Sequence, residues 1–474
     1  MKNEEPFTSL PRLLDLQIKN RSDLQRLTSY RTDQACRRFT PHIVENIRHS
    51  VNTSLRNITA IFILFDGATD NSVQEVAVVY VRYVTNGEPK TVFFSLQPVK
   101  HAHAQGLYEA IEQAFVDNGI DDWKRKLVGM ACDGAPVNLG RKNSVATRVK
   151  ENAECVVTVH CVAHRLELAI LQAIKDNRPL DDLKDIQKKI HKHYQYSPKV
   201  LREVKSIATS LETKVLKPNR VDGTRWTPHM QRALEVLATS YEVLLSHFEH
   251  VAEARPCEAT AEVRGRAAFL RNRLRDYRIL RFLHFLRDLL HVIASLSLIF
   301  QKDSLTVNGM LDALETANLE LTALKQSPGS KLAEFTAALQ RDSTGLEAMY
   351  KGTKLTDVQT DDSNTYPEVI ETVMQHMNKR FDSEADVSTP ILRAAMIFDL
   401  KEWPREKAEL AAYGDHDIKQ LWSLGRMDST EGIYCQCRVA FYFQCMLWRP
   451  PGEVCPYPDA TRCGVGSPSL FSCM

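Results

Sequence analysis

The chain has 474 residues, which suits roughly two to four domains. Its hydrophobic content of 43% and charged content of 25% are those of an ordinary globular protein. The formal net charge of +2 excludes a basic surface over the whole molecule, so any nucleic-acid binding has to come from a local patch. Because the sequence has no apolar run of about 18 residues and its N-terminus is charged, we predict no membrane span and no signal peptide.

The eleven cysteines fall into two groups. Five are scattered and form no CxxC pair: Cys36, Cys132, Cys155, Cys161 and Cys257. Six lie close to the C-terminus: Cys435, Cys437, Cys445, Cys455, Cys463 and Cys473. Their spacing fits no zinc module and no histidine lies among them, so we predict no zinc. In the absence of a signal peptide, we expect a reducing compartment.

Residues 1–56 are expected to form a helical lead-in. Leu10 to Ile18 carries leucines at helical spacing. Pro41 to Ser54 suits a second helix, for which Thr40 is the predicted N-cap and Pro41 the first helical residue.

Residues 57–227 have the pattern of a mixed α/β core. Three antiparallel strands are predicted at Ile58–Phe65, Val76–Val84 and Thr91–Leu96, with Asn86-Gly87 as a hairpin turn between the last two. Helices and strands then alternate: Ala104–Asn118 (helix), Leu127–Cys132 (strand), Arg141–Glu151 (helix), Cys155–Val159 (strand) and Ala163–Leu171 (helix). This order is the layout of an RNase H-like core.

Two aspartates follow predicted central strands. Asp66-Gly67 comes after the first strand and Asp133-Gly134 after the fourth. Functional groups collect at the carboxyl ends of strands in α/β sheets, and paired carboxylates there can hold Mg²⁺ for phosphodiester chemistry. The glycines would let the backbone turn tightly beside the metal. Asp-Gly at a strand end is also a common turn signal, so both interpretations stay open, and for Asp70 we favour a turn or cap.

Cys161 and His164 lie three residues apart where a strand leads into a helix, with His160 just before them. A zinc site would need two further ligands, and a Cys–His nucleophile would need an oxyanion-binding device that the sequence does not indicate. The ordinary interpretation is a buried cysteine and a histidine bonded to the backbone at the helix start.

Residues 228–395 are predicted to be helical, and 396–474 to form a partial return to the core followed by an irregular tail. Arg266 to Ser297 is a long helix or a helix pair. Between residues 264 and 287 lie eight arginines: Arg264, Arg266, Arg271, Arg273, Arg275, Arg278, Arg281 and Arg287. We favour ion-pair partners within a helical bundle, and the alternative is a phosphate-contacting surface.

Six segments together resemble the hAT-type DNA transposases, and more closely the zinc-finger-type vertebrate proteins domesticated from them. In order they are FDGATDNSVQEVAVVYVRYV (65–84), CDGAPVNLGRKNSVATRVKE (132–151), VHCVAHRLELA (159–169), TRW (224–226), FLRDLLHVIASLSLIFQKDSLTV (285–307) and IFDLKEWP (397–404). The resemblance lies in the ordered set, since no single segment is decisive.

The resemblance implies an RNase H-like core interrupted by a large helical insertion. It makes Asp66 and Asp133 the first two members of a three-carboxylate metal site. Cys161 and His164 match a CxxH motif near the active site and DNA, while Arg225 and Trp226 match a motif at the entry to the insertion. These four residues are therefore our candidate nucleic-acid contacts.

Two features of the family are not found. Its third carboxylate, a glutamate in a C-terminal dimerisation segment, has no match between residues 424 and 474, and none of Glu402, Glu406 and Glu409 fits the motif. Its N-terminal zinc-binding DNA-recognition finger is not found either. From these two departures together we expect a partial gene product or an isoform with a divergent last segment.

Because the third carboxylate of the metal site is missing, we expect two-metal catalysis to be severely impaired. We therefore expect a nuclear, transposase-derived, catalytically inactive scaffold that binds nucleic acid or protein partners, with nuclear localisation resting on the resemblance. One alternative is an Mg²⁺- or Mn²⁺-dependent transposase or nuclease that recruits another acid. Another is a protein-interaction module acting through the helical insertion.

Overall fold

The computed structural model describes residues 7–20, 29–69, 73–86, 88–153, 156–195, 198–213, 215–218, 226–302, 305, 307–359, 365–382, 394–398, 403–410 and 412–424. The chain divides into two compact units. The first, here called the sheet unit, comprises Met1–Val159 and Trp422–Met474, and the second, the helical unit, is His160–Leu421. Together they make a mixed α/β and helical protein, as predicted.

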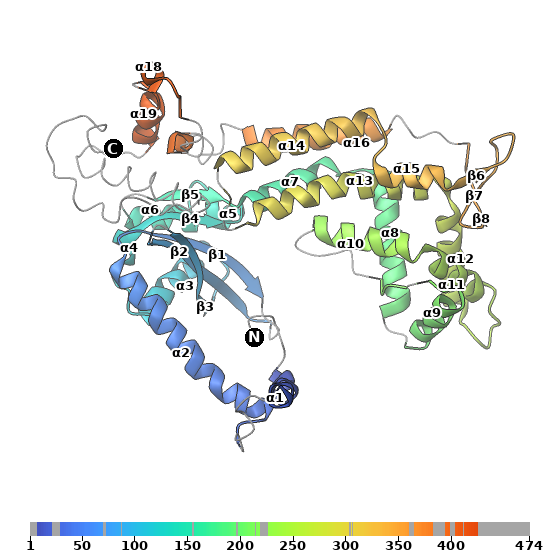
Figure 1. Cartoon of the computed structure of the whole chain (residues 1–474), viewed down its shortest axis with the longest axis horizontal. Coiled ribbons are helices and arrows are strands. Elements are labelled where there is room, and N and C mark those ends of the chain that lie inside the picture. Colours follow the sequence, from blue (N-terminus) through green and yellow to red (C-terminus); the bar gives the residue numbers. More distant parts are fainter. Residues whose placement is uncertain are drawn as a thin grey trace. The chain divides into compact units, whose positions relative to one another are not determined.

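The sheet unit is organised around five strands in the order β3-β2-β1-β4-β5 (Figure 1). They are β1 (Ile61–Thr69), β2 (Glu75–Thr85), β3 (Glu88–Pro98), β4 (Leu127–Cys132) and β5 (Val157–His160). β1 pairs antiparallel with β2 and parallel with β4, while β2 pairs antiparallel with β3. The predicted strand at Leu127–Cys132 and the hairpin are confirmed, and Asn86 has the positive φ of 51° that a tight hairpin turn requires.

β1 begins three residues later than predicted and ends four later. The sequence suggested a strand that stops at Phe65, whereas Asp66 lies inside β1 opposite Val78 of β2. The antiparallel ladder with β2 continues to Thr69, because backbone pairing does not depend on the polarity of the side chains that the strand carries.

Helices cover one face of this sheet. α3 (Ala104–Asp117) and α6 (Val145–Asn152) pack on it, with the short helices α4 (Trp123–Lys126) and α5 (Pro136–Leu139) between them in the chain. Alternate residues of β1 face them, including Ile61, Ile63 and Phe65. On the other face, the Phe62 ring lies over Gly129 of β4, where an added Cβ would come within 2.4 Å of the ring.

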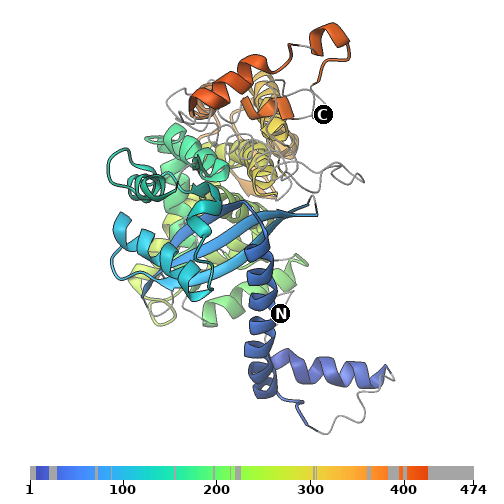
Figure 2. The same cartoon turned by 90° about the vertical axis from the view of Figure 1, so that its left-hand side faces the viewer.

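The lead-in is helical, with a boundary that differs from the prediction. α1 (Leu10–Lys19) follows the short 3₁₀ helix η1 (Phe7–Ser9), and α2 runs unbroken from Asp33 to Asn57 (Figure 2). Thr32 is its N-cap, so the prediction of Thr40 as the cap is wrong: the Thr40 hydroxyl instead donates to the Cys36 carbonyl. Pro41 lies inside the helix. Because proline has no backbone N–H, one carbonyl of the preceding turn lacks its helical hydrogen bond, but this carbonyl is exposed and water can reach it.

The helical unit contains ten α-helices among its described residues up to Asp382. They are α7 (Val162–Ala173), α8 (Arg178–Gln195), α9 (Pro198–Ser210), α10 (Trp226–Thr239), α11 (Tyr241–Ala252), α12 (Ala261–Arg275), α13 (Tyr277–Phe300), α14 (Val307–Gln326), α15 (Ser330–Ala337) and α16 (Thr365–Asp382). A small antiparallel sheet joins them, formed by β6 (Leu339–Arg341), β7 (Ala348–Tyr350) and β8 (Thr353–Lys354). The remaining described elements are η3 (Ala395–Phe398), α18 (Lys407–Leu410) and α19 (Asp415–Leu424).

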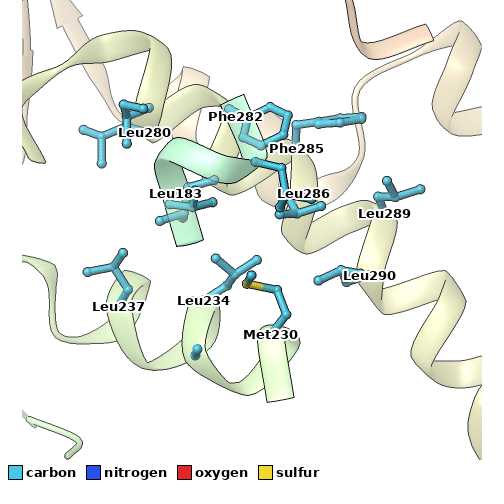
Figure 3. Close-up of a cluster of buried hydrophobic side chains, with 14 of the residues drawn as sticks. Leu183, Met230, Leu234, Leu237, Leu280, Phe282, Phe285, Leu286, Leu289 and Leu290 are labelled. Atoms are coloured by element: carbon cyan, nitrogen blue, oxygen red, sulfur yellow. The ribbon is translucent and has the colours of Figure 1, made fainter. Parts of the chain in front are cut away.

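α13 is the central helix of the helical unit. Figure 3 shows its side chains meeting those of α8 and α10, with Leu286 and Leu290 facing Met230 and Leu234. By length and composition α13 is the one described helix that could cross a membrane, but 67% of its most apolar window is buried inside the unit. Its apolar composition is therefore accounted for by packing in a protein core.

The division between the units differs from the predicted boundary at residue 227. α7, α8 and α9 belong to the helical unit, because Leu166, Leu183 and Val204 are buried in the same core as α10 and α13. Apolar periodicity predicts that a helix has a buried face, but it does not tell which of two cores receives that face.

Candidate functional site

Asp66 lies within β1, and Asp133 directly follows the end of the neighbouring strand β4. The parallel register of β1 and β4 pairs Ile63 with Met130 and Leu64 with Ala131. If this register is extended by two residues, past the end of β4, it sets Asp66 opposite Asp133; neighbouring strands of a sheet are about 4.8 Å apart. Asp66 is exposed and Asp133 half-buried. The topology thus brings together the two carboxylates that the sequence singled out.

Asp133 is held in place by its own loop. Its Oδ1 accepts hydrogen bonds from the Ala135 backbone N–H at 3.1 Å and from Asn138 Nδ2 at 2.5 Å. The first bond closes an Asx-turn, and the second comes from a side chain that is only 5% exposed. Asp133-Gly134 therefore also forms the turn that its sequence indicates. The other carboxylate oxygen of Asp133, Oδ2, has no hydrogen bond among the described residues.

The glycine beside the first aspartate is not required by geometry. Gly67 lies within β1 opposite Ala77, and a Cβ at this position would meet nothing within 4 Å. The expectation that Gly67 makes a tight turn beside a metal is wrong, because the strand continues through it.

Oxygen ligands of this kind fit a hard divalent cation. Mg²⁺ is commonly bound through one or two carboxylates together with waters or substrate phosphates, and Asp66 with the Oδ2 of Asp133 supplies such a set. A two-metal site needs more ligands. In the described part of the chain no three of the His, Cys, Asp and Glu side chains gather closely enough to hold a metal ion.

Cys161 and His164 lie in the helical unit at the start of α7. Cys161 is the N-cap residue, but its side chain makes no capping hydrogen bond and is exposed, so the expectation of a buried cysteine is wrong. The backbone leaves β5 at this junction, which turns the thiol outward. His164 is half-buried, and its ring lies 5.5 Å, centroid to centroid, from that of His160.

Trp226, the first residue of α10, is buried at 8% exposure. Lys184 Nζ lies 5.6 Å from its ring centroid, and the next backbone N–H, that of Thr227, donates to the buried Glu167 carboxylate at 2.8 Å. A carboxylate at a helix N-terminus is favourable, so this corner is a structural anchor of α10. Arg225, the other member of the motif, lies outside the described residues, as do Asp70 and the C-terminal cysteines.

The predicted ion pairing of the arginine row is confirmed. Carboxylates from several helices contact most of these guanidinium groups: Arg266–Glu262, Arg271–Glu253, Arg273–Asp182, Arg275–Glu249, Arg278–Asp357 and Arg287–Glu235. The guanidinium of Arg281 lies 5.5 Å from the ring centroid of Tyr366. The row is used largely within the helical unit, which argues against the alternative of a phosphate-contacting surface.

Sequence reasoning missed Asn138 and Glu167. The signal for Asn138 was its place five residues after Asp133, in the loop where an amide can reach back to a carboxylate. No sequence signal distinguishes the buried Glu167 from the surface acids of other helices, because its partner, the N-terminus of α10, is 60 residues away. The sequence matches no protein-family model.

Proposed function

We propose that this chain derives from an hAT-type transposase and acts in the nucleus as a catalytically inactive scaffold for nucleic-acid or protein partners. In this proposal the sheet unit belongs to an RNase H-like core, and residues 228–395 of the helical unit correspond to the family's insertion. Asp66 and Asp133 are the remnant of the metal site. The candidate nucleic-acid residues remain Cys161, His164, Arg225 and Trp226. Because Trp226 is buried, its part is to hold α10 in position rather than to contact the nucleic acid itself.

The observation that carries the proposal is the parallel pairing of β1 with β4, whose register, extended by two residues, sets Asp66 opposite Asp133. Among the described residues no third metal-binding side chain gathers with them. The strand order β3-β2-β1-β4-β5, with a helix between β3 and β4, supports the RNase H-like interpretation. One Mg²⁺ with two carboxylates can bind phosphate, but it cannot stabilise both the attacking and the leaving oxygen as a two-metal pair does.

The same pair of carboxylates favours one alternative, a working Mg²⁺-dependent nuclease. A supercoiled-plasmid nicking assay in Mg²⁺ and in Mn²⁺ separates the two functions, with a calorimetric Mn²⁺ titration alongside. We expect no nicking by the native chain, and unchanged partner binding in Asp66→Asn and Asp133→Asn. Asparagine suits position 133 because it keeps the Oδ1 acceptor for Ala135 and Asn138.

Asp121→Asn is the matched control, since Asp121 is an exposed carboxylate in the same unit. Nicking by the native chain that both site variants abolish and Asp121→Asn retains would overturn the scaffold proposal. Mn²⁺ binding that is lost in both site variants without any nicking would identify a retained metal site in an inactive protein.

A further inference from the structure

Asn138, which donates a hydrogen bond to Asp133, is a buried amide with one unsatisfied end. It lies on the four-residue helix α5 and is only 5% exposed. Its Nδ2 donates to Asp133 Oδ1 at 2.5 Å, whereas its own Oδ1 is buried and has no hydrogen-bond partner. A buried amide oxygen without a donor costs free energy, and such an atom commonly marks the place of a bound water or ion.

The loop after β4 holds this amide at a fixed place beside the carboxylate. The Asn138 backbone N–H donates to the Ala135 carbonyl at 2.9 Å, and the Ala135 N–H in turn donates to Asp133. The Gly140 N–H donates to the Pro136 carbonyl at 2.9 Å, and a Cβ on Gly140 would come within 2.4 Å of that carbonyl oxygen. The Asn138 side chain is therefore presented by a tightly closed loop, which favours a precise contact over a mobile one.

An amide oxygen at this place fits the chemistry of the two aspartates. Hard divalent cations take their oxygen ligands from carboxylates, from asparagine carbonyls and from water. The oxygen and nitrogen of an amide have nearly the same size, so the Asn138 amide fills the same space in either orientation. With Oδ1 turned toward Asp133, the amide oxygen and the carboxylate repel each other unless a cation lies between them.

We propose that Asn138 Oδ1 is a ligand of the divalent cation that Asp66 and Asp133 bind, in place of the third carboxylate of the family's site. Without the cation, the amide donates to Asp133 instead, as it does in this structure. Because an amide is neutral, it offsets less cationic charge than a carboxylate, so the site holds one cation rather than two. The inference rests on the proposed function in one respect, that the two aspartates are the remnant of a metal site.

Replacing the amide oxygen with sulfur tests whether Asn138 contacts the cation. A thiolate prefers soft cations such as Cd²⁺, whereas Mn²⁺ prefers oxygen ligands. Full-length Asn138→Cys is titrated with Mn²⁺ and with Cd²⁺ by calorimetry, and circular dichroism verifies that it is folded. We expect the Mn²⁺ affinity to fall about tenfold relative to the native chain and the Cd²⁺ affinity to rise by a similar factor. A side chain that only supports Asp133 would lose Mn²⁺ affinity without gaining any for Cd²⁺.

Asn143→Cys is the matched control, since Asn143 is an exposed asparagine in the same loop. It corrects for the added thiol and for the native Cys132, which precedes Asp133 in every variant. Both affinities of this control should equal those of the native chain. Asn138→Asp is a second test that does not depend on the folding of Asn138→Cys. It keeps an oxygen and adds a charge, so its Mn²⁺ affinity should be at least that of the native chain.

Four outcomes would overturn the inference. They are an unchanged Mn²⁺ affinity in Asn138→Cys, a Cd²⁺ affinity no higher than in Asn143→Cys, a weakened Mn²⁺ affinity in folded Asn138→Asp, and no Mn²⁺ binding by the native chain. None of them contradicts the scaffold function, because a scaffold needs no cation. Plasmid nicking by the native chain would instead overturn the scaffold function, and the Cd²⁺ titration would still decide whether Asn138 is a ligand.

Discussion

Acidification below pH 6.5 is expected to destabilise the helical unit through two histidines that it buries in contact. His193 of α8 and His247 of α11 are 5% and 0% exposed, and their ring centroids are 5.4 Å apart. The Tyr194 hydroxyl and His247 Nδ1 form a hydrogen bond of 2.9 Å. Burial lowers the pKa of each histidine from 6.5 to about 4. Glu203 opposes the shift at His193, while Arg266 adds to it.

Whether acidification raises or lowers the free energy of unfolding depends on which state, folded or unfolded, takes up protons at the higher pH. Above pH 6.5 both histidines are neutral in the folded and the unfolded chain, so their contribution to stability is fully present. As the pH falls from 6.5 to about 4, the unfolded chain is protonated before the folded one, and the free energy of unfolding decreases. Each pH unit costs about 1.4 kcal/mol per histidine, so acidification to about pH 5 removes about 2 to 4 kcal/mol for the coupled pair.

Urea unfolding followed by circular dichroism at pH 7.5 and at pH 5 measures this loss. His247→Asn keeps a polar atom near Tyr194 but cannot be protonated, so the variant should lose less stability on acidification than the native chain. His291→Asn, at an exposed position on α13, is the control and should behave like the native chain. A free energy of unfolding that falls equally in the native chain and in His247→Asn would refute this explanation.

Three further perturbations test the packing and the charge arrangement. Gly129→Ala should cost about 1 to 3 kcal/mol of stability because its Cβ meets the Phe62 ring, whereas Gly67→Ala, which enters open space, should cost less than about 1 kcal/mol, both measured by urea unfolding. Asp288→Ala should cost about 2 to 4 kcal/mol in the same assay, since this carboxylate accepts two backbone N–H groups at the start of α15. Any binding of a mixed-sequence DNA duplex should weaken only slightly with added salt in anisotropy titrations, because most of the arginine row is already ion-paired.

The strand order and the strand at Leu127–Cys132 could be predicted from the sequence because they depend on local patterns of apolar and turn residues. Leu127–Cys132 is a short apolar run closed by Asp-Gly, and it is β4 to the residue. The sequence alone did not show that β1 and β4 are parallel neighbours, which is what brings the chain at Asp66 and at Asp133 to adjacent positions in the sheet. The two supporting bonds to Asp133 depend on loop geometry that composition does not encode.

The errors arose where a local signal competed with a larger structure. Thr40-Pro41 has the composition of a helix start, but α2 already runs from Asp33 and passes through it, with its cap at Thr32. Partners distant in the sequence were equally hidden. Arg273 pairs with Asp182, and Arg287 with Glu235, residues on other helices that only the folded bundle brings near. The sequence shows that arginines alternate with apolar residues, but not which acids oppose them.

The distribution of charged and apolar side chains on the surface helps to distinguish nucleic acid from protein as the partner of this chain. The net charge is +2, and most of the one dense arginine row is neutralised by carboxylates of its own unit. A nucleic acid is bound mainly by cationic side chains that face its phosphates. An arginine that must break an ion pair within the protein to contact a phosphate contributes less binding free energy than an arginine without such a partner. On β3, by contrast, two large apolar side chains are exposed, Phe93 and Leu96. Within the scaffold proposal, we therefore propose protein partners before nucleic acid, and we expect a DNA contact to rely mainly on residues outside the arginine row.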